Sequence, residues 1–235
     1  MRIIAIDTGS AALSLALADE HGVVAEAGLN NGRQHSLTLL PMLDALLANA
    51  GWSLRQADAL ALTIGPGSFT GLRIGVATAK AWAQGVGLPL IAVSSLQAMA
   101  LTAAESGLSV CPVFDARRDE VYWALFDGEN RRLSEDAALA PAALAERLAA
   151  LRQPVVMAGD ALDKYAPLFA AALGDDFRPA PPQRRLFMAS AAALLGADKY
   201  ARGEFSEAAS LQPVYLRLSE AEEKKLAREA AADGR

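Results

Sequence analysis

The first thirty residues alternate between short apolar runs and polar turns. Apolar runs cover Arg2–Asp7, Leu13–Ala18 and Val23–Leu29. The segments between them, Thr8-Gly9-Ser10 and Asp19-Glu20-His21-Gly22, consist of residues that favour turns. This pattern predicts a meander of three consecutive strands.

After this meander the periodicity changes from that of a strand to that of a helix. Leucines recur at helical spacing from about Ser36 to Ala50, and Gly51 is a suitable stop. Pro41 fits only near the first turn of such a helix, or kinks it. The order that follows predicts a mixed sheet covered by helices. It runs strand Ala59–Ile64, helix Gly71–Gly85, strand Pro89–Val93 and helix Ser95–Glu105.

A second copy of this pattern then begins. Asp115 ends an apolar run 108 positions after Asp7, and Asp127 ends the next run 108 positions after Asp19. Two hairpins repeated at one offset indicate an internal duplication. The remaining predicted elements are helix Pro141–Leu151, strand Val155–Gly159, helices Ala161–Leu173 and Phe187–Ala201, and a proline-rich loop at residues 178–182.

The composition changes sharply after Leu218. Residues 220–229 are mostly charged and lack an apolar stripe wide enough to bury. We interpret them as a solvated helix or a frayed tail rather than as a binding element. The predicted organisation is therefore one domain at residues 1–106, a second at residues 107–217, and a charged tail at residues 218–235 that is helical or disordered.

The overall composition restricts the class of function. With 22 basic and 27 acidic residues the net charge is −5, and no basic run occurs, so tight unaided binding of nucleic acid is not expected. The single cysteine, Cys111, excludes an internal disulfide framework and a multi-cysteine metal site, and its apolar surroundings predict burial. The chain starts directly with a strand, and no apolar stretch reaches the roughly 18–20 residues that cross a bilayer. We expect a cytoplasmic protein.

The turn Asp7-Thr8-Gly9-Ser10 is the first candidate for chemistry. Backbone N–H groups at such a turn can approach a phosphate, and an Asp at a strand end can hold a metal ion or water. The same residues also suit a tight turn in which Gly9 has a positive φ and Asp7 bonds local amides. The residues by themselves leave both interpretations open.

A glycine-rich segment at residues 65–75 joins a predicted strand to a helix. Its sequence, Gly-Pro-Gly-Ser-Phe-Thr-Gly-Leu-Arg-Ile-Gly, lacks the Lys that follows the last Gly of a phosphate loop. It also fails to match the dinucleotide-binding pattern. What remains is a helix N-terminus with Ser68 and Thr70 as candidate caps.

Small residues recur every four positions along this helix, at Gly71, Gly75, Ala79, Ala83 and Gly87. A glycine inside a helix costs roughly 1 kcal/mol relative to alanine, so this ridge indicates that another backbone comes very close. That backbone belongs either to the chain's own sheet, which the spacing favours, or to another subunit. Bulky side chains beside the ridge make the helix apolar on most sides, which predicts a second buried side. They are Leu72, Ile74, Val76, Thr78 and Trp82.

The second hairpin turn carries Asp115, Arg117 and Arg118. At the 108-residue offset Arg117 takes the place of Gly9, and a long cation there would obstruct the approach of a backbone to a phosphate. Arg117 could contact an anion, but a turn in which it pairs with neighbouring acids is the preferred interpretation.

The remaining inventory of catalytic residues is thin. Neither His21 nor His35 has a second His or Cys at metal-ligand spacing. No Gly-x-Ser-x-Gly sequence is present to anchor a serine nucleophile. We interpret His35-Ser36 as the cap of the first helix. No catalytic residue and no metal ligand is predicted.

Four segments, in this order and spacing, resemble the TsaB (YeaZ) family. They are residues 4–10, residues 35–43, the glycine-rich residues 65–75, which are the most specific part, and residues 115–122. The similarity extends from residue 1 to about residue 217. It implies the actin/Hsp70/sugar-kinase fold, with two duplicated ribonuclease-H-like (actin-like ATPase) domains, each an α/β unit with a mixed five-stranded sheet and flanking helices.

The resemblance also implies a subunit without catalysis. In the catalytic paralogue TsaD, two histidines four residues apart bind a metal just after the strand that matches Pro89–Val93. The matching residues here are Ser95 and Met99, and neither can replace an imidazole. With Arg117 at the second turn, both halves of a nucleotide–metal site are compromised. No cofactor is required on this basis, and weak binding of ATP or ADP near the Asp7–Ser10 turn stays open.

Partners follow from the resemblance as well. It implies a heterodimer with TsaD, recruitment of TsaE, a homodimer when the chain is alone, contact with tRNA only through the complex, and no membrane. The complex would transfer a threonylcarbamoyl group to adenosine 37 of tRNAs that read ANN codons, giving t6A. The alternative is an active ATP-dependent small-molecule kinase or peptidase-like enzyme of the same fold. The implied interface lies on the helix after His35 and on the small-residue helix Gly71–Gly87. Its implied residues are His35, Gly71, Leu72, Ile74, Gly75, Thr78, Ala79 and Trp82.

Overall fold

The computed structural model describes residues 1–31, 34–105 and 107–217 and contains two sheets. The predicted meander forms the outer and central strands of the first sheet. The strand order is β3-β2-β1-β4-β5; β1 pairs antiparallel with β2 and parallel with β4. The predicted tail at residues 218–235 lies outside the described residues. The strands are β1 (Arg2–Asp7), β2 (Leu13–Asp19), β3 (Gly22–Leu29), β4 (Ala59–Thr63) and β5 (Leu90–Val93).

Two helices cover one face of this sheet, α1 (His35–Ala50) and α2 (Phe69–Val86). Gly51 ends α1 in the left-handed conformation, as its position predicted, because a residue without a Cβ adopts that conformation at little cost. Pro41 lies inside α1, which continues past it. Leucines of α1 and the alanines of α2 pack with the apolar side chains of β1, β2 and β4 in one cluster. A short 3₁₀ turn, Leu54–Gln56, precedes β4.

The second sheet repeats this topology. Its order is β10-β9-β6-β7-β8, and β6 pairs antiparallel with β7 and parallel with β9, as β1 does with β2 and β4. Two five-stranded mixed sheets with the same connections confirm the predicted fold class and the duplication. The elements are β6 (Ser109–Arg117), β7 (Glu120–Trp123), β8 (Ala137–Leu139), α4 (Pro141–Ala149), β9 (Val155–Ala158), α5 (Leu162–Leu173) and β10 (Phe177–Pro179).

Two short strands are absent from the sequence prediction. The proline-rich stretch predicted as a loop begins with β10, and β8 lies in a segment with no strand pattern. Both are edge strands, where proline and short lengths are tolerated because one side of the strand needs no partner. Cys111 is fully buried in the core of the second half, as predicted.

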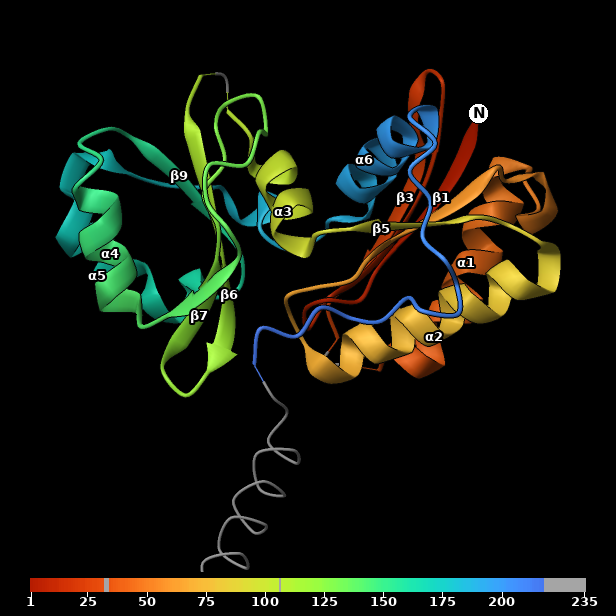
Figure 1. Ribbon diagram of the computed structural model, residues 1–235, viewed down its shortest axis with the longest axis horizontal. Coiled ribbons are helices and arrows are strands. Elements are labelled where there is room, and N and C mark those ends of the chain that lie inside the picture. Colours follow the sequence, from red (N-terminus) through yellow and green to blue (C-terminus); the bar gives the residue numbers. More distant parts are fainter. Residues whose placement is uncertain (32–33, 106, 218–235) are drawn as a thin grey trace, which may run out of the picture.

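The last helix of each half packs on the sheet of the other half. Helix α3 (Ser95–Ala103) lies on β6 and β9, whereas α6 (Ala189–Ala201) lies on β1, β2, β4 and β5 (Figure 1). The two sheets therefore divide near residue 106, but the helices that cover them do not follow that division. The domain assignment from chain order placed α6 with residues 107–217, and the structure places it on the first sheet.

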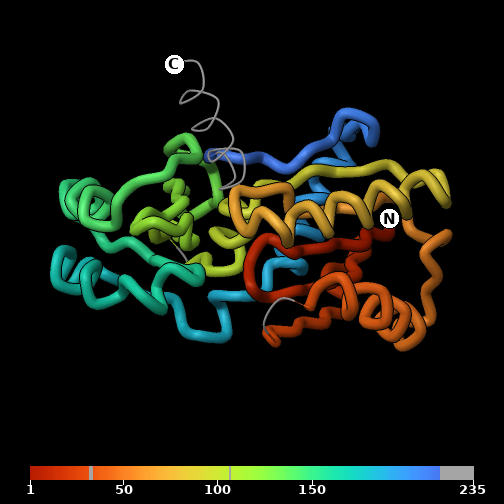
Figure 2. Tube along the Cα trace, turned by 90° about the horizontal axis from the view of Figure 1, so that it is seen from below, coloured from red at the N-terminus to blue at the C-terminus, as the bar shows by residue number. Residues whose placement is uncertain are grey.

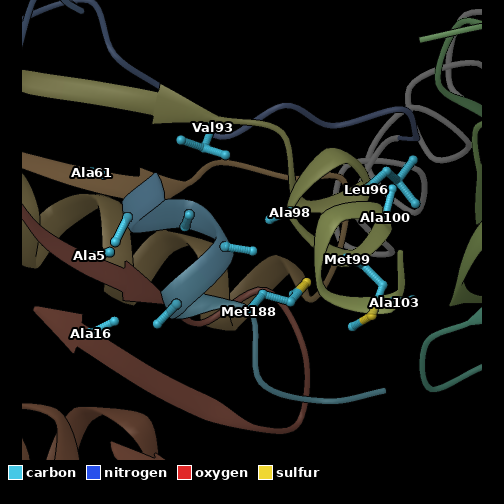
Figure 3. Close-up of a cluster of buried hydrophobic side chains, with 14 of the residues drawn as sticks. Ala5, Ala16, Ala61, Val93, Leu96, Ala98, Met99, Ala100, Ala103 and Met188 are labelled. Atoms are coloured by element: carbon cyan, nitrogen blue, oxygen red, sulfur yellow. The ribbon is translucent and has the colours of Figure 1, made fainter. Parts of the chain in front are cut away.

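The face of the first sheet that receives α6 is lined with alanines, which explains the close fit. A Cβ at Gly196 of α6 would lie 2.6 Å from the Cβ of Ala61, so helix and sheet are in direct contact. Figure 3 shows Ala5, Ala16 and Ala61 facing α6, with the side chains of α3 beyond it. A single apolar cluster runs from the first sheet through α6 and α3 to Phe114 and Phe126 of the second half.

Candidate functional site

The Asp7–Ser10 turn closes the hairpin between β1 and β2 and is buried. The Asp7 carboxylate is inaccessible to solvent; its Oδ1 accepts hydrogen bonds from the Gly9 N–H at 3.0 Å and from the Thr63 hydroxyl at 2.7 Å. Burial raises the pKa of Asp7 to about 6, although these two bonds and the nearby charge of His35 lower it in part. Asp7 thus bonds local amides, as one of the two sequence interpretations predicted.

Gly9 does not have the positive φ that this interpretation assigned to it. The small size of Gly9 matters instead, because a Cβ at this position would lie 3.1 Å from Ser95 Oγ and 3.3 Å from Asp7 Oδ1. The turn is therefore packed against the start of α3 as well as against its own strand.

Ser14 on β2 links this turn to helix α6. Its hydroxyl donates to Asp7 Oδ2 at 3.4 Å and accepts from the backbone N–H groups of Met188 and Ala189, at 3.2 and 3.1 Å. The first N–H groups of a helix have no partner inside the helix, so Ser14 satisfies two such groups of α6. Sequence reasoning missed Ser14 and Thr63. The signal for Ser14 was present, because it is a polar residue within an otherwise apolar strand.

The glycine-rich segment lies directly on the turn. The Ser68 N–H donates to the Gly9 carbonyl at 2.6 Å, and a Cβ at Gly67 would overlap that same oxygen. A Cβ at Gly71 would overlap the Thr8 carbonyl oxygen. The ridge of small residues on α2 therefore approaches the chain's own hairpin, which is the partner that its spacing favoured.

Ser68 caps α2 by accepting from the Gly71 N–H at 3.3 Å, as predicted, whereas Thr70 is inside the helix and does not cap it. With the segment in place, Thr8 and Ser10 are buried and the Gly9 N–H is used by Asp7. A phosphate at this turn would have to displace residues 65–71. The geometry favours a packed turn over a phosphate-binding one.

His35 does not cap α1. The cap position is Gln34, and the buried His35 ring donates from Nε2 to the Ser10 carbonyl at 3.1 Å. Ser10 O has only lone pairs to offer, so the proton lies on Nε2. His35 thus ties α1 to the first turn.

The predicted partner interface divides into a buried and an accessible part. The buried residues are His35, Gly71, Leu72, Gly75 and Ala79, and in this structure they pack within the fold. Of these, Gly71 packs on the Thr8 carbonyl and Gly75 on the Thr8 side chain. The accessible part is a stripe on successive turns of α2, formed by Ile74, Thr78 and Trp82.

Helix α1, which the resemblance also placed at the interface, adds exposed apolar side chains that were not among the predicted interface residues. Leu37 and Leu40 are 71% and 51% exposed. Helices α1 and α2 contact each other on the same face of the first sheet (Figures 1 and 2). The exposed leucines and the partly exposed α2 stripe therefore belong to neighbouring helices of one layer. We call Leu37, Leu40, Ile74, Thr78 and Trp82 the outer surface of the α1–α2 layer.

The second hairpin turn is exposed and ion-paired. Asp115 accepts from the Arg117 N–H at 2.9 Å, and its carboxylate lies 3.3 Å from the Arg117 guanidinium. Arg117, Arg118 and Asp119 all have positive φ. The Asp119 carboxylate accepts from Lys164 at 2.8 Å, which lowers the pKa of Asp119. The salt-bridged turn preferred from the sequence is confirmed.

Ser95 and Met99, at the positions where the resemblance implied metal ligands in TsaD, are both part of the packed interior. Ser95 Oγ accepts from the Gly65 N–H at 3.1 Å, and Met99 is buried in the core that the two halves share. Across residues 1–31, 34–105 and 107–217, no group of three or more His, Cys, Asp or Glu side chains could hold a metal ion. In the same part of the chain no helix has the length and apolarity needed to span a membrane.

Residues 16–225 match the family model described as TsaD: tRNA N6-adenosine threonylcarbamoyltransferase. A curated relative from Bacillus subtilis, the tRNA threonylcarbamoyladenosine biosynthesis protein TsaB, is 33% identical over 95% of this chain and 97% of its own length.

Solved structures agree with this assignment. A Pseudomonas aeruginosa protein described as similar to peptidase YEAZ superimposes with a TM-score of 0.76 at 31% identity, over 92% of this chain and 99% of its own. The ROK hexokinase of Thermus thermophilus, 14% identical with a TM-score of 0.54 over 86% of this chain and all of its own, shares the fold alone. The chain belongs to the TsaB (YeaZ) family.

Proposed function

We propose that this chain acts in tRNA threonylcarbamoyladenosine biosynthesis as a non-catalytic subunit that binds a TsaD-type transferase. The observation that carries this proposal is the burial of the Asp7–Ser10 turn beneath the chain's own residues 65–75. A turn that is closed in this way has lost the backbone groups with which a nucleotide-binding relative would hold a phosphate.

Two further features support the absence of turnover. Ser95 and Met99, which stand where the resemblance puts metal ligands, are committed to a backbone bond and to the core. The second turn neutralises Arg117 with Asp115. The Gly9 N–H and the Arg117 guanidinium are thus already paired with Asp7 and Asp115, and the chain would need no cofactor of its own.

The outer surface of the α1–α2 layer is the site proposed for the partner. This surface has exposed leucines on α1 and a partly exposed Ile and Trp on the neighbouring α2. Covering them with another apolar surface removes them from water and so lowers the free energy. The match to the TsaD family model suggests a partner of the same fold, so the equivalent helices of that partner are the expected counterpart. TsaE and tRNA would join through this complex, since a net charge of −5 gives the chain little attraction for RNA.

Light scattering of the purified chain mixed with TsaD tests the proposal. A heterodimer is expected at micromolar concentrations, and persistent monomers would contradict the subunit role. Leu40→Glu and Ile74→Glu should each weaken the complex at least about tenfold, since burying one unpaired charge costs more than 1.4 kcal/mol. Leu133→Glu is the matched control, because Leu133 is 54% exposed but lies in the second half. Equal affinity of all three variants for TsaD would show that the interface lies elsewhere on the chain.

Calorimetry with ATP and Mg²⁺ tests the missing chemistry separately. We expect no tight binding and no hydrolysis by the chain alone. Tight binding with turnover would instead favour the kinase-like or peptidase-like alternative.

A further inference from the structure

The segment after α6 crosses the molecule without forming a helix or a regular strand. Residues 204–217 leave the first sheet's α6 side, pass the edge strand β5 and run along α2 toward the second half (Figures 1 and 2). The end of this segment, Gln212 to Arg217, belongs to the part of the sequence that resembles the TsaB family. Neither its position nor its contacts are explained by the proposed partner surface.

Three groups of contacts fix the segment to the first half. The Ser206 N–H donates to the Leu90 carbonyl at 2.8 Å, which covers part of the open edge of β5. The Lys80 ammonium on α2 donates to the carbonyls of Ala209 and Leu211, at 3.3 and 3.2 Å. Leu211 is buried in the core beneath α2. These bonds occupy backbone groups that the segment, lacking regular structure, could not otherwise pair.

The third group lies at the start of the glycine-rich segment. The Val214 N–H donates to the Ile64 carbonyl at 2.7 Å, and a Cβ at Gly65 would lie 2.6 Å from the Val214 carbonyl oxygen. The Tyr215 ring lies 4.6 Å from the Phe69 ring, and its hydroxyl accepts from the Arg73 guanidinium at 3.1 Å. The segment is therefore packed on the same loop that covers the first turn.

Two residues further on, the segment reaches the other half. The Arg217 guanidinium donates to Glu120 Oε2 at 2.6 Å and to the Ala116 carbonyl at 3.4 Å, both at the β6–β7 hairpin turn. The Arg217 side chain is 21% exposed, and charge-assisted bonds that are partly shielded from water are stronger than neutral ones.

We infer that residues 204–217 form a strap that fastens the first half to the second hairpin turn and so limits how far the two halves can move apart. The shared core joins the halves through α3 and α6 on one face of the first sheet. The strap lies on α2, on the opposite face, so it adds a link on the side away from the shared core. Opening of the halves about the core would have to break the Arg217 contacts first. This inference does not depend on the proposed function.

Electron paramagnetic resonance distances in the full chain test the strap. Spin labels at Ala77→Cys on α2 and Ala143→Cys on α4 report the separation of the halves, because both positions are exposed and Cys111 is buried. The otherwise unchanged chain should give one narrow distance distribution. Arg217→Ala and Glu120→Gln should each broaden it toward longer distances.

Arg202→Ala is the matched control. Arg202 forms its ion pairs with Asp198 and Glu204, near the start of the strap, and not with an acid of the β6–β7 hairpin. It should leave the distribution unchanged. Far-ultraviolet circular dichroism checks that each variant folds. A narrow distribution that is unaltered in both Arg217→Ala and Glu120→Gln overturns the strap, and broadening in both of them but not in Arg202→Ala supports it.

Discussion

The two hairpin turns have kept one bond and differ in nearly everything around it. In each turn the Asp at the end of the central strand accepts from the N–H two residues later, at 3.0 Å for Asp7 and 2.9 Å for Asp115. Asp7 is then buried among hydroxyl groups and backbone amides, whereas Asp115 stays partly exposed beside an arginine. The bond from the Asp to the N–H two residues later was preserved, while the backbone beyond it and the surroundings diverged, since Arg117 has a positive φ and Gly9 does not.

The connections that follow the parallel strands account for the difference. After β4, residues 64–68 lead to α2 and lie across the first turn. After β9, residues 159–161 lead straight to α5, and Asp160 accepts from the Asp115 N–H at 2.9 Å without covering the turn. The longer, glycine-rich connection after β4 therefore buries the first hairpin turn, whereas the short connection after β9 leaves the second turn at the surface.

Helix α2 should be far more sensitive to added volume where it packs on the first turn than near its other end. Gly71→Ala places a methyl group on the Thr8 carbonyl, which is backbone and cannot move aside, so we expect a loss of about 3 kcal/mol in the free energy of unfolding. Gly85→Ala, in the same helix with nothing near its Cβ, should gain up to about 1 kcal/mol. Urea unfolding measures both. Similar values for the two variants would mean that the segment does not press on the turn.

The buried carboxylate of Asp7 should give the first turn a pH dependence of its own. The pKa of Asp7 is about 6 in the folded chain against about 4 when unfolded, so the folded state binds the proton more tightly. The free energy of unfolding should therefore fall as the pH rises from about 4 to about 6, by on the order of 2 kcal/mol, and stay level above that. Asp7→Asn should remove this part of the slope, whereas Asp115→Asn should keep it. A slope that persists in Asp7→Asn would contradict the assignment.

The second turn should tolerate the residue that the first turn requires. Arg117→Gly removes an exposed ion pair, worth little, and also relieves a positive φ of 65° that glycine adopts without strain. We expect the free energy of unfolding to change by less than about 0.5 kcal/mol in a urea titration. A loss of more than 1.5 kcal/mol would show that the Asp115–Arg117 pair is a structural requirement, and the contrast between the turns would weaken.

Much of the fold could be read from local patterns. The meander, the two long helices of the first half and the repeat at 108 residues follow from apolar periodicity and from Gly51 as a stop, which depend on neighbours in the chain. The short strands β8 and β10 carried no such pattern, because edge strands are held by one neighbour and need few apolar residues. The cap assigned to His35 failed for a related reason, since its bond to Ser10 comes from 25 residues away.

The sequence by itself determined that a backbone must lie against the small residues of α2, that the second turn carries its own counter-charges, and that the chain has two related halves. Spacing reports that something comes close, but it cannot say what. Only the tertiary structure decided that Gly71 and Gly75 meet the first turn, that Ser14 holds α6, and that the halves exchange their last helices. These outcomes depend on which surfaces meet in three dimensions, between segments as far apart as Ser14 and Ala189, which are separated by 175 positions. There apolar area and shape select the partner, and no local preference acts.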